Sequence, residues 1–212
     1  MAAEAVTEKK TALYAVARRL AWVLVKVLMP VKYHGLEKIR DRKGPFVLIS
    51  NHQHALDPVA IACPLREECV FLGKKELGKN PFLIRCLTNL HCILVDRHHT
   101  DMEAMRACMK AVRLGKVLVI FPEGTRHHEG QMEQIENGTS LIVLRSKAPL
   151  VPIYFDRPLK FFRRTNAYVG DDIPYEDLLE SGVNKDSCEA LNERMRETFR
   201  RMIAENAPKA GQ

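Results

Sequence analysis

Short apolar runs alternate with helix-like segments along most of the chain, and this alternation constrains the fold more than any other feature of the sequence. From Gly44 onward, each apolar run is too short to be a helix, and most are followed by apolar residues at helical spacing. Strands joined by helical crossovers form α/β domains. We therefore expect an α/β fold whose mostly parallel central sheet is flanked by helices. Its predicted strands cover residues 46–50, 70–72, 92–95, 117–121 and 150–155.

Three helices are predicted between and after these strands. Thr100 followed by Glu103 has the spacing of a capping box and predicts a helix that runs to about Leu114. A second helix is expected over residues 139–147. A third carries one apolar stripe after a candidate cap at Ser187, and we expect it to close the core.

Length and composition favour one globular unit. A chain of 212 residues with 46% hydrophobic residues can bury one core, because single domains typically reach roughly 250 residues before they divide. The sequence contains no repeat, low-complexity tract or linker that would mark a boundary. We expect a single domain over residues 30–212, preceded by a helical segment within residues 1–29.

The charge of the chain favours an anionic partner. Its 33 Lys and Arg exceed its 26 Asp and Glu, which gives a formal net charge of +7. Nucleic acid, acidic lipid and a phosphorylated small molecule would all suit this excess. The basic residues are not interleaved with aromatic ones and no nucleic-acid-binding motif is present, so we expect no nucleic-acid partner.

The cysteines and paired histidines are expected to have no special chemistry. The six cysteines contain no C-x-x-C pair and no secretory signal precedes them, which favours reduced thiols in the cytoplasm. The histidine pairs at residues 98–99 and 127–128 lack a carboxylate or cysteine at ligand spacing. We therefore expect no metal.

The amino-terminal segment has the pattern of an amphipathic helix. Its apolar residues follow helical spacing, whereas Arg18, Arg19 and Lys26 fall together on the other side. The uninterrupted apolar part, residues 20–25, is far shorter than the ~20 residues that a spanning helix needs. With Trp22 beside basic residues, the pattern predicts a helix that lies in a membrane interface. The alternative is a surface helix whose apolar side packs on the protein core. The apolar positions are Leu13, Val16, Ala17, Leu20, Ala21, Leu24, Val27 and Leu28.

The first candidate site follows the predicted strand 46–50 and reads Asn-His-Gln-His-Ala-Leu-Asp at residues 51–57. Ligands of open α/β sheets bind outside the carboxyl ends of the strands. His52 and Asp57 can fold into hydrogen-bond reach there, so that the imidazole takes a proton from an alcohol while the carboxylate orients it. An alternative is that Asp57 only caps a helix whose first residue is Pro58.

The second candidate site follows the predicted strand 117–121 and reads Phe-Pro-Glu-Gly-Thr-Arg at residues 121–126. Gly124 permits a tight turn near a ligand, Arg126 offers a planar fork that matches phosphate, and Glu123 could hold a substrate hydroxyl. The alternative is a surface turn with a solvent-screened ion pair.

Together with Val-Asp-Arg at residues 95–97 and Val-Pro-Ile at 151–153, these two segments resemble the four ordered blocks of the glycerolipid acyltransferase family, the 1-acylglycerol-3-phosphate acyltransferases. The match covers about residues 33–154, and Gly-Lys-Lys-Glu-Leu at 73–77 is similar to the family's segment between the first two blocks. The resemblance implies a cytoplasmic membrane-surface enzyme that moves an acyl group from acyl-CoA or acyl carrier protein to lysophosphatidate, without a cofactor.

The resemblance also implies roles for individual residues. His52 would be the catalytic base and Asp57 its partner. The acceptor's phosphate and glycerol would be bound by a set of five positions: Lys74, Arg97, Glu123, Gly124 and Arg126.

Two departures from the family pattern leave the acceptor open. The family usually has a small residue after the arginine of the third block, where this chain has two histidines at residues 127–128. Near Gly138 it commonly has an aromatic residue and a lysine, where this chain has Ile-Glu-Asn. Glycerol-3-phosphate, another lysophospholipid or an amino-acid lipid are alternative acceptors, and a non-catalytic lipid-binding protein is the alternative from another class.

Overall fold

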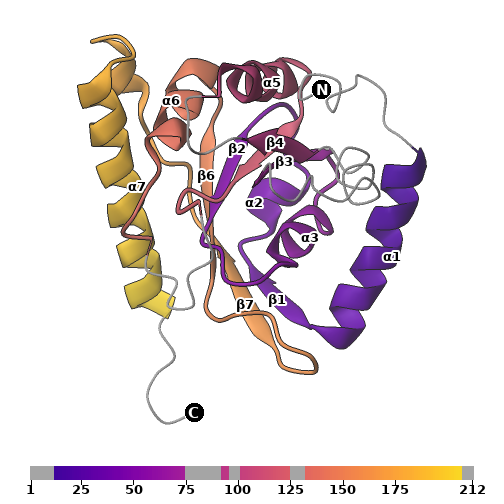
Figure 1. Cartoon of the computed structure of the whole chain (residues 1–212). Helices are drawn as coiled ribbons and strands as arrows, with labels where there is room; N and C mark the ends of the chain where they lie inside the picture. The colour runs from indigo at the N-terminus through magenta and orange to yellow at the C-terminus, as the bar shows by residue number, and fades with distance from the viewer. Residues whose placement is uncertain (1–11, 75–91, 96–100, 125–131, 207–212) are drawn as a thin grey trace.

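The computed structural model describes residues 12–74, 92–95, 101–124 and 132–206. In these residues the chain forms a seven-stranded sheet with helices on both of its faces (Figure 1). The strands lie in the order β1-β7-β6-β2-β5-β3-β4. Every neighbouring pair is parallel except β6 with β7. The predicted α/β class with a mostly parallel central sheet is confirmed.

The strands are β1 (Val31–His34), β2 (Val47–Ser50), β3 (Cys69–Lys74), β4 (Cys92–Val95), β5 (Val117–Ile120), β6 (Leu150–Phe155) and β7 (Thr165–Val169). The helices are α1 (Ala12–Leu28), α2 (Glu37–Arg40), α3 (Asp57–Ala62), α5 (Met102–Arg113), α6 (Asn137–Ser146) and α7 (Lys185–Asn206), with a 3-10 turn η3 at Glu176–Leu179.

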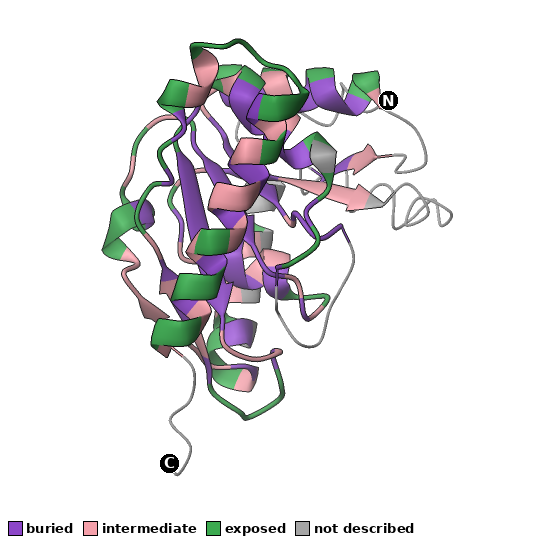
Figure 2. Ribbon diagram, turned by 90° about the vertical axis from the view of Figure 1, so that its left-hand side faces the viewer, coloured by how far each residue is buried: buried purple, intermediate pink, exposed green. Residues whose placement is uncertain are grey.

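The central strands have apolar residues on both faces because both faces are covered. β2, β5 and β6 are buried along their whole lengths, as expected of strands between two helical layers. Phe46 and Leu48 pack into the cluster that contains α1, α2 and α3. Val47 and Ile49, which alternate with them, pack into the cluster that contains α5, α6 and α7. Figure 2 shows the buried strands between helices with exposed outer faces.

Helix α1 packs on the domain in a different orientation from the one its sequence pattern suggests. Its buried side includes Val25, which is 4% exposed, and Arg18 is half-buried and donates to the carbonyl oxygen of Leu65 at 2.8 Å. Arg18 therefore does not share a solvent face with Arg19 and Lys26, which are exposed. Within the described ranges, none of the helices combines the length with the apolar character needed to cross a bilayer.

Four apolar side chains of α1 stay exposed. They are spaced along one side of the helix, and each is more than half exposed: Val16, Leu20, Val23 and Val27. Three of them belong to the predicted apolar stripe, so that stripe lies partly outside the protein core. We name these four side chains the α1 stripe.

Two helix caps differ from the prediction. Helix α5 is capped by Asp101, whose side chain accepts a hydrogen bond from the amide of Ala104 at 2.9 Å, so the cap predicted at Thr100 was wrong by one residue. Helix α7 is preceded by Asn184, whose Oδ1 accepts from the amide of Ser187 at 2.9 Å, while the Ser187 hydroxyl accepts from the amide of Asn184 at 2.9 Å. Ser187 is thus the second member of a capping box in which Asn184 is the cap.

A buried ion pair joins the amino ends of β3 and β5. Lys116 Nζ lies 2.8 Å from Glu68 Oε2, both side chains are 6% exposed, and the amide of Val117 donates to the carbonyl oxygen of Glu68. Removing one partner of such a pair destabilises the fold because it leaves a buried charge uncompensated. Replacing both partners by apolar residues often leaves the stability unchanged.

The Lys116→Met variant should lower the free energy of unfolding by about 3 to 5 kcal/mol. The double variant Lys116→Met with Glu68→Leu should recover most of that loss, because no charge is then left unpaired. Urea unfolding followed by circular dichroism measures both. A single variant as stable as the parent chain, or a double variant as unstable as the single one, would contradict this assignment.

Candidate active site

The two candidate segments meet at one edge of the sheet. β2 and β5 are parallel neighbours, with Ile49 opposite Ile120, so the residues that follow them leave the sheet side by side. The backbone N–H of His52 donates to Glu123 Oε2 at 3.4 Å. The His52 ring also stacks on the ring of Phe121, with centroids 4.2 Å apart. Segments that are about seventy residues apart in the chain therefore form one site.

The predicted contact between His52 and Asp57 is present. His52 Nδ1 lies 2.9 Å from Asp57 Oδ2, and the carboxylate side chain is 2% exposed. Because a carboxylate accepts hydrogen bonds, this contact favours the tautomer with its proton on Nδ1. Nε2, on the other side of the ring, then carries a lone pair that can take a proton. The imidazole is 18% exposed, so an entering substrate can reach it.

Asp57 Oδ2 also organises the loop backbone. It accepts hydrogen bonds from the amides of Gln53 at 2.8 Å and His54 at 2.7 Å, in addition to the imidazole. No side-chain cap bond is made to α3, although Pro58 stands in its first turn. The carboxylate therefore faces back toward the loop, and the alternative in which Asp57 only caps a helix is not supported.

His54, the other imidazole of the loop, has a different environment. Its Nδ1 accepts from the amide of Leu56 at 3.2 Å. Asp57 contacts His54 only through the backbone amide and contacts His52 through the ring. This arrangement favours His52 over His54 as the candidate base.

Glu123 joins three parts of the site. The residue is 6% exposed, and its Oε1 accepts from the amide of Met132 at 3.2 Å while its Oε2 faces His52. Gly124 has a φ of 68°, in the region that favours glycine, and its amide donates to the carbonyl oxygen of Phe121 at 3.0 Å. The turn brings the Glu123 carboxylate against the backbone of the first segment. These contacts give Glu123 a positioning role, while its predicted contact with the acceptor stays a prediction.

The basic residues of the predicted site are only partly described. Arg97 and Arg126 lie outside the described residues. Lys74 is the last residue of β3, but its side chain is also outside them. β3 lies beside β5 and β4 in parallel, so its carboxyl end is at the same edge of the sheet as His52.

Asn51 has a contact that the sequence did not reveal. Its Nδ2 donates to the carbonyl oxygen of Phe155 and its Oδ1 accepts from the amide of Phe155, both at 2.9 Å, and the residue is fully buried. This pair fixes the start of the loop to the end of β6. The available signal was an amide side chain directly after a buried strand, because such a side chain can pair with a backbone donor and acceptor at once.

The histidine pairs at 98–99 and 127–128 lie outside the described residues. Among the residues that are described, no group of three or more His, Cys, Asp or Glu side chains could hold a metal ion. Burial raises the pKa of Cys92 and of Cys108 to about 12, which keeps both thiols protonated. Both therefore act as small apolar side chains.

The known proteins that this chain resembles are acyltransferases. The family model for Acyltransferase matches residues 30–156. A putative 1-acyl-sn-glycerol-3-phosphate acyltransferase, acl-2, of Caenorhabditis elegans is 30% identical over 142 residues, which are 66% of this chain and 50% of that protein. The 1-acyl-sn-glycerol-3-phosphate acyltransferase of Helicobacter pylori is 30% identical over 132 residues, 60% of this chain and 56% of that protein. The chain thus spans about half the length of these two relatives.

A bacterial relative and a solved structure are matched over more of their length. The 1-acyl-sn-glycerol-3-phosphate acyltransferase of Bacillus subtilis is 26% identical over 184 residues, 82% of this chain and 91% of that protein. The crystal structure of the 1-acyl-sn-glycerophosphate (LPA) acyltransferase PlsC from Thermotoga maritima is similar with a TM-score of 0.67 and 17% identity, over 93% of this chain and 81% of that chain. At this identity the structural match supports the fold.

Asn51→Ala should destabilise the chain, because both backbone groups of Phe155 lose their side-chain partner inside the protein. Each buried group left unsatisfied costs roughly 1 to 3 kcal/mol, so for the two groups we expect a total loss of about 2 to 6 kcal/mol in urea unfolding. Gln134→Ala, at an exposed position, is a control for the loss of an amide side chain. Equal stability of Asn51→Ala and the parent chain would show that this pairing does not hold the loop.

Proposed function

The chain belongs to the acyltransferase family, and from this premise we propose that it transfers a fatty acyl group to the free hydroxyl of 1-acylglycerol-3-phosphate, giving phosphatidate for phospholipid biosynthesis. The observation that carries the proposal is the 2.9 Å contact of His52 Nδ1 with Asp57 Oδ2 beside Glu123 of the second candidate segment. The relatives are named for this activity, which supports lysophosphatidate as the acceptor. The donor is a thioester, acyl-CoA or acyl carrier protein, and no cofactor is required.

The geometry supports direct transfer. His52 Nε2 takes the proton of the acceptor hydroxyl while the hydroxyl oxygen attacks the thioester carbonyl carbon. The tetrahedral intermediate then breaks its carbon–sulfur bond, and the departing sulfur takes the proton back from the imidazolium. Asp57 stabilises the imidazolium between these steps. The loop at residues 51–57 contains no Ser or Cys, so the acceptor's own oxygen is the nucleophile.

Electrostatics would set the choice of acceptor. We propose that Arg97 and Arg126, which follow β4 and β5, bind the phosphate, with Lys74 at the end of β3 adding positive charge. β3, β4 and β5 are parallel to β2 in the sheet, so their carboxyl ends lie at the edge that carries His52. Gly124 would let the phosphate approach the turn. An oxyanion donor near the strand ends would contribute roughly 3 to 4 kcal/mol.

We also propose that the protein works at the cytoplasmic face of a membrane as a peripheral or monotopic protein. Its acceptor is a lipid, and the α1 stripe presents apolar side chains to the outside with Arg19 and Lys26 exposed on the same helix. An apolar side bordered by basic residues is typical of interfacial helices. The membrane is thus the surface from which the acceptor is drawn.

His52→Ala should lower kcat by about 10² to 10⁴-fold, the usual contribution of a general base. Lysophosphatidate binding and the thermal unfolding midpoint should stay near those of the parent chain. The measurement is transfer from radiolabelled acyl-CoA to a panel of acceptors. His54→Ala is the matched control and should retain most of the activity, since it keeps the backbone amide that Asp57 binds.

Turnover of His52→Ala within about tenfold of the parent rate would exclude His52 as the base. A parent chain that is silent across the whole acceptor panel, yet still binds lipid, would favour the non-catalytic alternative. A higher rate with glycerol-3-phosphate or another lysophospholipid would keep the mechanism and change the acceptor.

Arg126→Ala should raise KM for lysophosphatidate by roughly 10 to 100-fold, because a charged hydrogen bond to phosphate contributes about 1.5 to 3 kcal/mol. The rate with monoacylglycerol, which has the same hydroxyl and no phosphate, should change little. Steady-state kinetics with the two acceptors test this. An equal loss with both would show that Arg126 does not act through the phosphate.

A further inference from the structure

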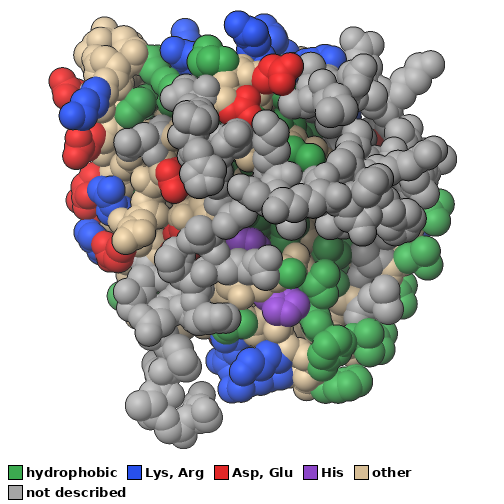
Figure 3. Space-filling view, in the orientation of Figure 1, with side chains coloured by type: hydrophobic (Ala, Val, Ile, Leu, Met, Phe, Trp, Pro, Cys, Tyr) green, Lys and Arg blue, Asp and Glu red, His purple; other side chains and the backbone are tan. Residues whose placement is uncertain are grey.

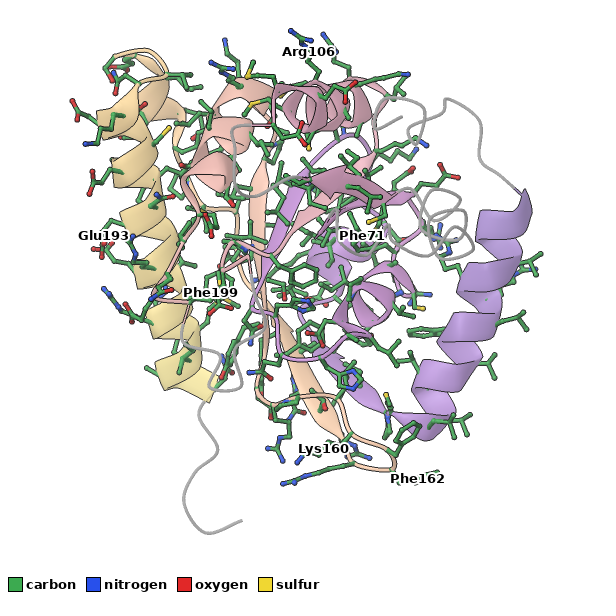
Figure 4. All side chains as sticks on the ribbon, in the orientation of Figure 1. Phe71, Arg106, Lys160, Phe162, Glu193 and Phe199 are labelled. Carbon is green, nitrogen blue, oxygen red and sulfur yellow. The ribbon has the colours of Figure 1, made fainter. Side chains whose placement is uncertain are left out.

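The loop between β6 and β7 presents two aromatic side chains to the outside. Phe161 is 64% exposed and Phe162 is 77% exposed, and Phe162 is the most exposed large hydrophobic side chain in the described part of the chain. Their rings lie 6.4 Å apart. Figure 4 shows Lys160 and Phe162 at the lower edge of the molecule, beyond the ends of the strands. We name residues 158–164 the aromatic loop.

The aromatic loop is held in place by the body of the protein. Leu159 is 2% exposed and anchors it in the core, and Lys160 pairs with Arg163 in an isolated bridge. The amide of Phe162 donates to the carbonyl oxygen of Leu28 at 2.6 Å. Phe162 has a φ of 57°, a backbone conformation that bulky residues rarely adopt. Backbone strain of this kind persists where the surroundings hold it, often at functional sites.

The aromatic loop and α1 form one surface. Leu28, which accepts the bond from Phe162, is the last residue of α1, and the amide of Thr165 donates to the carbonyl oxygen of Pro30 at 3.0 Å. The α1 stripe and the two phenylalanines account for six of the nine exposed large hydrophobic side chains of the described residues, so these are gathered and not scattered. Figure 3 shows hydrophobic side chains along the lower right margin, beside a basic group at the bottom.

The charged side chains of the two chain segments that form this surface have one sign. Residues 12–34 and 157–170 contain no Asp or Glu. The exposed basic side chains of the two segments are Arg19, Lys26, Lys32, Lys160, Arg163 and Arg164. Aromatic side chains flanked by Lys and Arg suit the boundary between headgroups and acyl chains, where the cations meet anionic lipid. This charge complementarity selects a bilayer with anionic lipid as the occupant.

The aromatic loop lies at the same edge of the sheet as His52. It follows the carboxyl end of β6, and β6 is parallel to β2, whose carboxyl end leads into the loop at residues 51–57. The paired hydrogen bonds between Asn51 and Phe155 connect the start of the loop at residues 51–57 to the end of β6, three residues before the aromatic loop begins. A bilayer that receives the aromatic loop would therefore lie against the edge at which the acceptor must enter.

We propose that the aromatic loop is a second membrane-binding element, in which Phe161 and Phe162 insert into an anionic bilayer beside α1 and turn the edge that carries His52 toward the lipid. The benefit to catalysis rests on the proposed function. The insertion itself does not, because it can be measured without turnover.

The test compares full-length variants for binding to phosphatidylcholine vesicles with and without phosphatidylglycerol, followed by flotation. Phe161→Ser with Phe162→Ser should lower affinity for anionic vesicles by at least about tenfold, since insertion depends on buried apolar area. Val183→Ser, which removes an exposed apolar side chain from another surface, is the matched control and should bind like the parent chain. Thermal unfolding should be unchanged in both variants.

A triple variant, Lys160→Gln, Arg163→Gln and Arg164→Gln, should lose affinity for the anionic vesicles and little for the neutral ones. Unchanged binding by the double phenylalanine variant would overturn the proposal, as would an equal loss in Val183→Ser. So would a finding that the phenylalanine pair controls self-association in gel filtration instead of vesicle binding. Vesicle binding that depends on the phenylalanines in a His52→Ala chain supports the proposal whether or not the acyl transfer is found.

Discussion

One buried carboxylate oxygen holds the proposed chemistry in place. Asp57 Oδ2 accepts hydrogen bonds from the imidazole of His52 and from the amides of Gln53 and His54. A buried carboxylate is costly unless it is hydrogen-bonded, so the loop must close around it. The same closure fixes the His52 ring against Phe121 and leaves Nε2 for an incoming hydroxyl. Loop folding and activation of the base are thus consequences of one set of contacts.

The parallel sheet determines which segments of the chain lie beside His52. Because β2, β5 and β6 run in the same direction, the segments that follow them emerge at one edge. Glu123 reaches the backbone of His52 from β5, and Phe155 at the end of β6 pairs with Asn51. The aromatic loop continues from that same strand end. The common direction of these strands therefore brings His52, the turn that contains Glu123 and the aromatic loop to one edge, although they lie far apart in the sequence.

Much of this architecture could be predicted from the sequence. The buried central strands are recognisable because both of their faces are apolar, and the prediction for residues 150–155 matches β6. The edge strand β1 and its neighbour β7 were missed, since they are short, partly exposed and contain Lys32 and Asn166. Periodicity also could not show which side of α1 faces the protein, because that depends on where α3 packs.

The sequence predicted which residues would carry the chemistry of the site better than it predicted the contacts that hold them in place. The pairing of His52 with Asp57 follows from a short spacing after a strand, whereas the pairing of Asn51 with Phe155 joins residues 104 positions apart. The exposed phenylalanines at 161 and 162 carry no periodic signal, because a loop has none. Their exposure is a property of the fold alone.

The central claim, that Asp57 holds His52 as a base at Nε2, is tested most directly by the tautomer of that ring. Nitrogen-15 NMR of histidine-labelled protein, at a pH where His52 is neutral, reports which ring nitrogen carries the proton. The account predicts a proton on Nδ1 and an unprotonated Nε2 in the parent chain. A neutral His52 with its proton on Nε2 would contradict it.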